Sequence, residues 1–101
     1  MTPTQRTLKK LRSGGWTCAI TEHWNAWIKR RQDLFGFVDI IAIKDGTTMA
    51  IQTTSGSNTS ARVKKILASK HYPILKKAGW DIRVWGWRKL KSGWACKENI
   101  L

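Results

Sequence analysis

An Asp-Gly pair between two segments rich in apolar and β-branched residues constrains the fold of this chain more than any other feature. Asp45 and Gly46 separate the most apolar run, residues 34–43, from residues 48–54. Asp-Gly suits a two-residue hairpin turn because both positions accept positive φ angles. We therefore predict two antiparallel strands with Lys44 paired to Thr47. A four-residue loop keeps this register, whereas a three-residue loop breaks it.

Asp39 lies inside that apolar run, where an unpaired charge costs several kcal/mol, so it needs a partner or a metal ion. The predicted register sets Asp39 opposite Gln52, with Thr54 on the same face one step along. Glu22, near the end of an alternating run over residues 16–23, is a further candidate. Oxygen donors from Glu22, Asp39 and Gln52 would suit Mg²⁺ or Mn²⁺. The alternative is a buried Asp–Gln hydrogen bond with Glu22 solvated.

The charge balance predicts a polyanionic partner. Nineteen Lys and Arg stand against six Asp and Glu, for a formal net charge of +13. Such a surplus favours DNA, with RNA as an alternative, although it could also serve solubility alone. We expect phosphate contacts from two basic segments and from the loop that begins the second: Lys29, Arg30, Arg31, Ser57, Asn58, Arg62, Lys64 and Lys65.

The order of predicted elements indicates one α/β domain over residues 1–101, with a mixed central sheet flanked by helices. Trp85 and Trp87 are expected to pack against a helix rather than to stack on bases. Cys18 and Cys96 are too few for a disulfide scaffold, and no signal segment or membrane span is evident, so the expected location is the cytoplasm. The predicted helices cover residues 4–12, 60–70 and 73–77, the strands cover 16–23, 34–43, 48–54, 80–87 and 94–97, and residues 24–32 are expected to be irregular.

Three segments resemble small phage and prophage members of the PD-(D/E)XK nuclease superfamily, of Holliday-junction-resolvase and restriction-endonuclease type. They are Asp33-Leu-Phe-Gly-Phe-Val-Asp39, Ala50-Ile-Gln-Thr-Thr-Ser-Gly-Ser-Asn58 and Ala61-Arg-Val-Lys-Lys-Ile66. With Glu22-His-Trp24 and Ile82-Arg-Val-Trp-Gly-Trp-Arg88, the likeness covers nearly the whole chain. The resemblance implies a phage-encoded protein of the host cytoplasm with a restriction-endonuclease-like αβββαβ core. It also implies Mg²⁺- or Mn²⁺-dependent hydrolysis of DNA, including branched or otherwise structured DNA.

The motif of this superfamily is an Asp on one strand, then an acid, any residue and a Lys on the next. Asp39 matches the Asp, and Glu22 resembles an upstream Glu that many members use as an additional metal ligand. Gln52 stands in the place of the acid and Thr54 in the place of the Lys. The resemblance thus implies Glu22, Asp39, Gln52 and Thr54 as catalytic positions and the first three as metal ligands.

The missing Lys leaves two interpretations open. In some members of the superfamily this Lys migrates to the following helix, which here offers Arg62, Lys64 and Lys65. The alternative is a non-catalytic module that binds nucleic acid or protein and retains the nuclease fold with a degenerate site. A phage protein that blocks a host factor is a third option, and a homodimer is one expected form of assembly.

Overall fold

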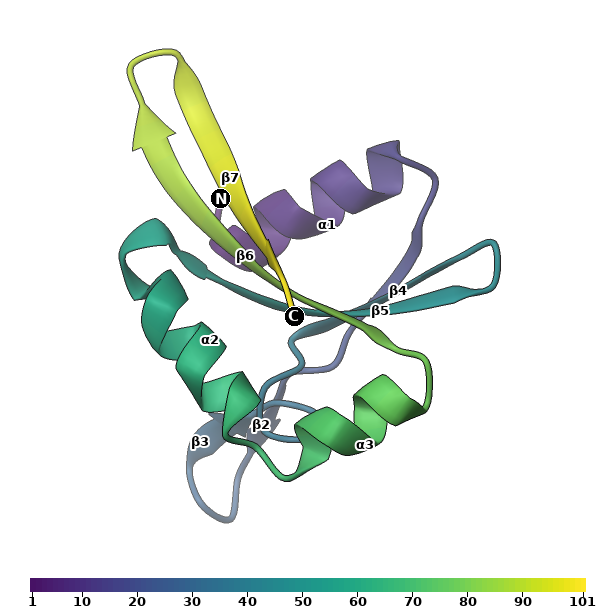
Figure 1. The fold of residues 1–101 in the computed structure, drawn as a ribbon. Coiled ribbons are helices and arrows are strands. Elements are labelled where there is room, and N and C mark those ends of the chain that lie inside the picture. Colours follow the sequence, from purple (N-terminus) through teal and green to yellow (C-terminus); the bar gives the residue numbers. More distant parts are fainter.

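A mixed five-stranded sheet with helices on both faces forms the body of the protein in the computed structural model, which describes residues 1–101 (Figure 1). The sheet order is β1-β4-β5-β6-β7, and only β5 and β6 are parallel. Strands β2 and β3 form a separate hairpin. This arrangement confirms the α/β class and the mixed sheet. The elements are α1 (Pro3–Ser13), β1 (Thr17–Ile20), β2 (His23–Asn25), β3 (Arg30–Gln32), β4 (Ile40–Lys44), β5 (Thr47–Ser55), η1 (Gly56–Asn58), α2 (Thr59–Leu67), α3 (His71–Lys77), β6 (Asp81–Leu90) and β7 (Gly93–Ile100).

The predicted hairpin around Asp45 and Gly46 is confirmed, together with its register. Lys44 pairs with Thr47, and the ladder continues to Ile40 opposite Ile51. Asp45 has φ 48° and Gly46 has φ 78°. Two successive positive φ angles are the signature of the type I′ turn, which matches the twist of the strands that it joins.

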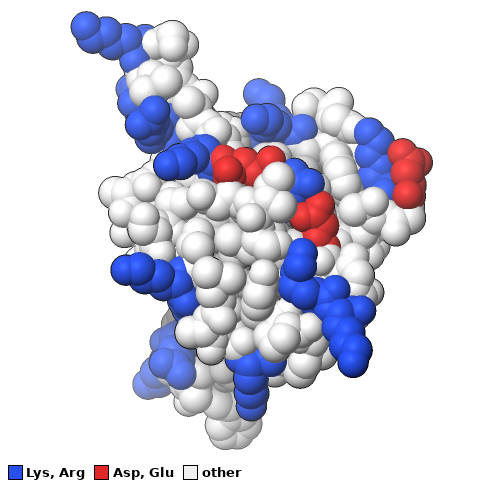
Figure 2. Space-filling view, viewed as in Figure 1, with Lys and Arg blue, Asp and Glu red and all other residues white.

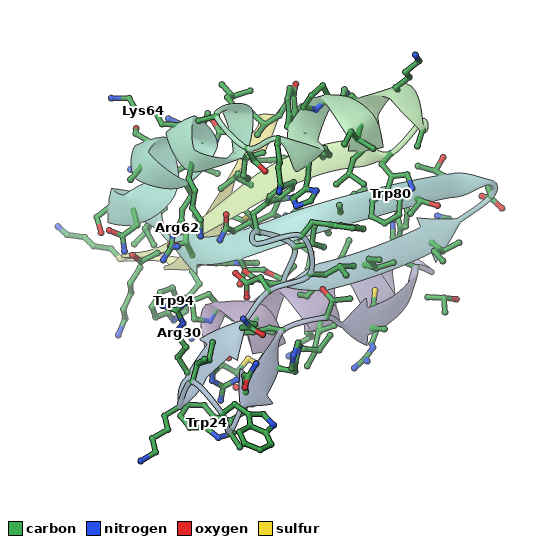
Figure 3. All side chains as sticks on the ribbon, turned by 90° about the horizontal axis from the view of Figure 1, so that it is seen from below. Trp24, Arg30, Arg62, Lys64, Trp80 and Trp94 are labelled. Atoms are coloured by element: carbon green, nitrogen blue, oxygen red, sulfur yellow. The ribbon has the colours of Figure 1, made fainter.

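Alternation along the strands divides the apolar side chains between the two faces of the sheet (Figures 1 and 3). One core lies under α1 and the other under α2 and α3. Each fully buried aliphatic side chain in them contributes roughly 1.5–3 kcal/mol. The α1 core includes Leu8, Leu11, Ile40, Ile51, Trp85 and Trp87, and the opposite core includes Phe37, Val38, Ala50, Ile66, Leu75 and Val84.

Trp85 and Trp87 are buried in the α1 core, which confirms the expectation that they pack rather than stack on bases. Each indole N–H also has an acceptor. Trp85 donates to a Glu98 carboxylate oxygen at 2.7 Å, and Trp87 donates to the Thr7 hydroxyl at 2.9 Å. Buried indoles are stable only with such partners, so both rings are fixed in the core.

The strand predicted over residues 34–43 is shorter than expected, because β4 begins only at Ile40. The preceding residues reverse direction in a tight turn closed by Leu34 and Val38, whose backbone groups exchange hydrogen bonds of 3.1 and 2.9 Å. Phe35 and Gly36 have φ angles of 55° and 81°. A glycine adopts positive φ angles without penalty. Gly36 thereby permits a chain reversal that a continuous strand could not contain.

Residues 24–32, expected to be irregular, instead form most of the β2–β3 hairpin. The strand predicted over residues 16–23 accordingly ends at Ile20, and Glu22 lies just before β2. Asn25 organises the turn, since its side-chain oxygen accepts hydrogen bonds from the N–H groups of Trp27 and Ile28. These Asx hydrogen bonds specify the hairpin, although its strands lack the alternation of apolar residues that usually indicates a strand pair.

The remaining differences are in element ends. The helix predicted over residues 60–70 is α2, which stops at Leu67, and α3 begins at His71 with Pro73 in its first turn, where a missing N–H costs nothing. Strands β6 and β7 are both longer than predicted. They pair along their length, from Arg83 opposite Ile100 to Leu90 opposite Gly93. No helix of the protein combines the length and the apolar character needed to cross a membrane.

Candidate metal centre

Three acidic side chains converge at one end of the sheet. Carboxylate oxygens of Glu22, Asp33 and Asp39 all lie within 4.8 Å of one another. Three like charges so close repel each other strongly unless a proton or a cation intervenes. A small set of carboxylate oxygens is also what a hard divalent ion prefers as its ligands.

The first pair in this cluster follows from the β2–β3 hairpin. His23 pairs with Gln32 at the base of the hairpin. Extending that register by one residue sets Glu22 beside Asp33. The hairpin therefore begins and ends at two members of the acidic cluster.

The second pair follows from the turn before β4. Leu34 and Val38 form an isolated antiparallel bridge, so the next residues outward, Asp33 and Asp39, face each other. The backbone of Thr21 secures this end of the turn, donating from its N–H to the Asp39 carbonyl at 2.8 Å. Two consecutive reversals of the chain thus assemble the cluster.

Asp39 is the most enclosed of the three, with 5% of its surface exposed. Burial, and then a hydrogen bond with Asp33, raises the pKa of Asp39 to about 8, although the Thr53 N–H that donates to its Oδ2 at 2.9 Å opposes this shift. The charges of Asp33 and Glu22 add to the increase in pKa. Burial and the neighbouring acids therefore favour the protonated form of the Asp39 carboxyl when no cation is bound.

Gln52 lies on β5 between the two residues that Asp39 contacts. Asp39 accepts from the Thr53 N–H and donates its own N–H to the Ile51 carbonyl at 3.0 Å. Gln52 is 3% exposed, and its Oε1 is buried without a hydrogen-bond partner. The alternative of a buried hydrogen bond from Asp39 to this oxygen is therefore not realised. An unpartnered buried carbonyl costs roughly 1–3 kcal/mol, so a donor or cation beside this oxygen would be stabilising.

Thr54, which stands in the place of the motif Lys, is also buried and pairs with Gly86 of β6. Alternation along β5 keeps it on the same face as Gln52. This position therefore supplies no charged side chain. Any Lys or Arg near the cluster must come from another element.

A cavity of about 540 Å³ adjoins the cluster at Asp33. Arg30 and Arg31 of β3 line it together with Lys65 of α2. The structure thus brings together members of the two basic segments singled out in the sequence. Arg31 also approaches Glu22, with 3.4 Å between Nη1 and Oε1. Because the Arg31 side chain is largely exposed, this pair is weak enough for Arg31 to exchange Glu22 for another anion.

The other predicted phosphate contacts lie apart from this cavity. Lys29 is exposed at the tip of the β2–β3 hairpin, and Arg62 is partly buried on α2. Lys64 lines a separate cavity of about 290 Å³ with Lys97. Figure 3 shows Lys64 at the outer side of α2. The structure therefore separates Lys64 from Lys65, although they are neighbours in the chain.

Ser57 and Asn58 precede α2, but neither caps it through a side-chain hydrogen bond. Asn58 instead donates to the Ser55 hydroxyl at 3.0 Å. Ser57 lines a cavity of about 300 Å³ with Arg88 and Lys97. The sequence prediction missed these two cations, because it ended the β6 strand before Arg88 and did not establish which strand pairs with β7.

Asp33 is the acidic ligand that sequence reasoning missed. A strand over residues 34–43 would hold Asp33 and Asp39 about 20 Å apart, at roughly 3.3 Å per residue. The signal that could have revealed the reversal is Gly36, a glycine inside an apolar run, which often marks a bend.

Basic side chains occupy many places around the face seen in Figure 2, whereas acidic ones are confined to a few. This distribution agrees with the net charge of +13. Comparison with protein families gives no match, and comparison with curated proteins finds none of significant similarity. Function therefore rests on the chemistry of the site itself.

Proposed function

We propose that the protein is a DNA endonuclease that depends on Mg²⁺ or Mn²⁺ and has a restriction-endonuclease-like fold. The observation that carries this proposal is the cluster of Glu22, Asp33 and Asp39 at the edge of a cavity lined by basic side chains. Metal-dependent hydrolysis of a phosphodiester uses acidic ligands for the metal ion and basic side chains for the phosphate, and here the two sets adjoin.

The donor set fits a hard divalent ion. It offers carboxylate oxygens within 4.8 Å of one another, and the unpartnered Oε1 of Gln52 is on the adjacent strand. A cation would replace the proton that Asp39 otherwise retains and would relieve the repulsion among the acids. When bound, such an ion supplies Lewis-acid activation of water and neutralises charge at a phosphodiester.

The remaining groups would hold and orient the DNA. Arg30 and Lys65, which both line the cavity, would bind backbone phosphates next to the acidic cluster. Water then adds to phosphorus, and the bond to the leaving sugar oxygen breaks, giving a phosphate monoester and a hydroxyl. Lys65 would take the part of the motif Lys, because it reaches this cavity and Thr54 carries no charge.

The order of elements supports the restriction-endonuclease-like assignment. An N-terminal helix, three antiparallel strands β1, β4 and β5, helix α2 and the parallel strand β6 follow one another. This is the αβββαβ order that the resemblance implies, with the β2–β3 hairpin inserted after the first strand and α3 added after α2. A phage origin remains part of the same proposal.

A non-catalytic nucleic-acid-binding module is the second candidate. Gln52 and Thr54 favour it, since both are uncharged and buried where an active member of the superfamily carries an acid and a Lys. In that case the basic cavities would bind DNA or RNA while the acidic cluster held a structural ion or a shared proton.

Cleavage assays with matched variants test the proposal. Duplex, gapped and four-way-junction DNA would be incubated with the wild type in Mg²⁺, in Mn²⁺ and in EDTA. We expect metal-dependent cleavage that Asp39→Asn abolishes and Asp45→Asn retains, because Asp45 undergoes the same substitution but lies in a distant exposed turn. Binding in EDTA should weaken by orders of magnitude between about 50 and 200 mM salt. A wild type that binds DNA but cuts none of these forms in either metal would favour the second candidate.

A further inference from the structure

The β2–β3 hairpin presents large apolar side chains, at its tip and on β2, that contact little of the protein. Trp27 is 95% exposed, Trp24 is 60% exposed and Ile28 is 44% exposed. Figure 3 shows Trp24 on the β2–β3 hairpin, directed away from the five-stranded sheet. Indole rings usually contribute to a core or an interface, so two exposed ones within four residues indicate a surface that contacts another molecule.

The tip is an ordered turn. The Asn25 side-chain oxygen accepts from the N–H of Trp27 at 3.0 Å and from that of Ile28 at 3.4 Å. Its amide nitrogen donates to Gln32 at 2.9 Å, and Lys29 closes the turn with a φ of 52°. Because the backbone under Trp27 is already fixed, binding through this ring would cost little conformational entropy.

The charge of the hairpin fits nucleic acid. Residues 23–32 contain no Asp or Glu, and Lys29, Arg30 and Arg31 follow Trp27 closely. Aromatic rings beside cations are the combination that binds unpaired nucleotides, since bases stack on the rings and phosphates pair with the cations. Trp24 lies directly opposite Arg31, so this combination also occurs along the strands of the hairpin.

The hairpin is inserted between two members of the acidic cluster, Glu22 and Asp33. Trp27 is five residues from Glu22, a reach of at most about 17 Å at roughly 3.3 Å per residue. One DNA strand advances about 3.4 Å per base. A strand with a phosphate at the cluster would therefore present to Trp27 a base that lies no more than about five nucleotides from that phosphate.

We propose that the β2–β3 hairpin is a base-stacking finger, in which Trp27 stacks on an unpaired base within about five nucleotides of the phosphodiester at the acidic cluster. This inference rests on the proposed nuclease function and specifies its substrate class. The substrate is DNA with an unpaired or branched segment, because the bases of a continuous duplex are already stacked on each other and give Trp27 no free face.

Binding in EDTA tests the finger separately from cleavage. Two probes are compared. One is a duplex with a four-nucleotide gap and 2-aminopurine in the unpaired strand opposite the gap, and the other is the matching continuous duplex. The wild type should quench the 2-aminopurine and prefer the gapped DNA. Trp27→Ala should lose most of the quenching and bind gapped DNA at least about fivefold more weakly, with unchanged affinity for the duplex. Trp27→Phe should retain most of both effects.

Two controls make the result specific. Trp94→Ala removes an exposed indole on β7, where the ring stacks with Arg6, and should leave the quenching and the gapped-DNA preference unchanged. Trp27→Ala should melt like the wild type, since the ring is almost fully exposed. Because no metal is present, these results do not depend on nuclease activity, and a protein that cuts nothing can still show the finger.

Two outcomes would overturn the inference. One is a Trp27→Ala protein with the same ratio of gapped to duplex affinity as the wild type. The other is tighter binding of the wild type to vesicles of anionic lipid than to gapped DNA, with Trp27→Leu as active as the wild type on those vesicles. The latter result would identify the hairpin as a membrane-binding element, because insertion into lipid requires an apolar side chain but no aromatic face.

Discussion

Asp33 and Asp39 have carboxylate oxygens within 4.8 Å of each other although a five-residue turn separates them in the chain. The turn depends on Gly36, which has a φ of 81°. A side chain at this position would meet no neighbouring atom within 4 Å, so its cost is conformational and not steric. The positive φ angles of Phe35 and Gly36 therefore bring the second acid to the first, and Gly36 supplies the one position in the turn where no Cβ opposes this conformation.

Gly36→Ala should destabilise the protein by about 1–2 kcal/mol, the cost of a left-handed conformation for a residue with a Cβ. It should also reduce the stabilisation that Mg²⁺ or Mn²⁺ confers. Gly46→Ala is a matched control, because Gly46 has a φ of 78° and equally open surroundings but lies in the β4–β5 turn. Urea unfolding of both variants with and without metal checks this. An equal metal response in the two would show that the turn does not serve the cluster.

The stability of the metal-free protein should fall as the pH rises from about 4 to about 8. Burial, followed by the hydrogen bond with Asp33, raises the pKa of Asp39 to about 8 in the folded protein, against about 3.9 when unfolded. Between these values the folded state binds the extra proton, so raising the pH favours unfolding. Asp39→Asn should flatten this dependence, and saturating Mg²⁺ should oppose it. Thermal melting in EDTA from pH 5 to 8.5 measures the effect, and an unchanged slope in the variant would contradict the assignment to Asp39.

The parts of the fold and of the acidic cluster that could be predicted from the sequence are those specified by a local sequence pattern. Asp45-Gly46 determined a turn type and hence a register, and that register holds from Lys44 to Ile40. The position of Asp33 was missed because residues 34–38 are apolar enough to extend a strand, and only Gly36 indicates otherwise. The β2–β3 hairpin was missed because side-chain hydrogen bonds of Asn25, and no alternation of apolar residues, define it.

Gln52 gives a test of the metal site through two opposite substitutions. Gln52→Glu should lower stability in EDTA, because it adds an acid near Asp39, but should gain more stability from Mg²⁺ than the wild type does. Gln52→Leu removes the unpartnered Oε1, so it should be neutral or stabilising in EDTA and should lose metal response. Melting temperatures of the three proteins with and without Mg²⁺ check both results. Identical metal responses in all three would exclude Gln52 from the site.

Gly86→Ala should destabilise the protein through a single clash. A Cβ at Gly86 would overlap the Thr59 hydroxyl and lie 3.3 Å from the Gly56 Cα, so the Thr59 side chain and the η1 backbone would have to shift. Overpacking of this kind costs about 1–3 kcal/mol. Thr59→Ala removes the hydroxyl and should recover part of the loss, as a double-mutant cycle would reveal. Additive effects of the two substitutions would mean that β6 and α2 do not meet at this point.

The two adjacent lysines of α2 allow a test for the cation that replaces the motif Lys. Lys65 lines the cavity at Asp33, whereas Lys64 lines the separate cavity with Lys97. Both are exposed and carry the same charge, so their loss should weaken DNA binding to a similar extent. Of the two, only Lys65 lines the cavity at the acidic cluster, where the proposed function requires the scissile phosphate to bind.

Lys65→Ala should therefore lower the cleavage rate at saturating DNA by about 10²–10³-fold, the usual loss for one electrostatic contact to a developing anion. Lys64→Ala should raise the DNA concentration needed for saturation and leave the saturated rate unchanged. Single-turnover cleavage over a range of protein concentrations separates the two quantities. If both variants reach the wild-type rate at saturation, α2 supplies no catalytic cation, and the basic cavity serves only to hold DNA.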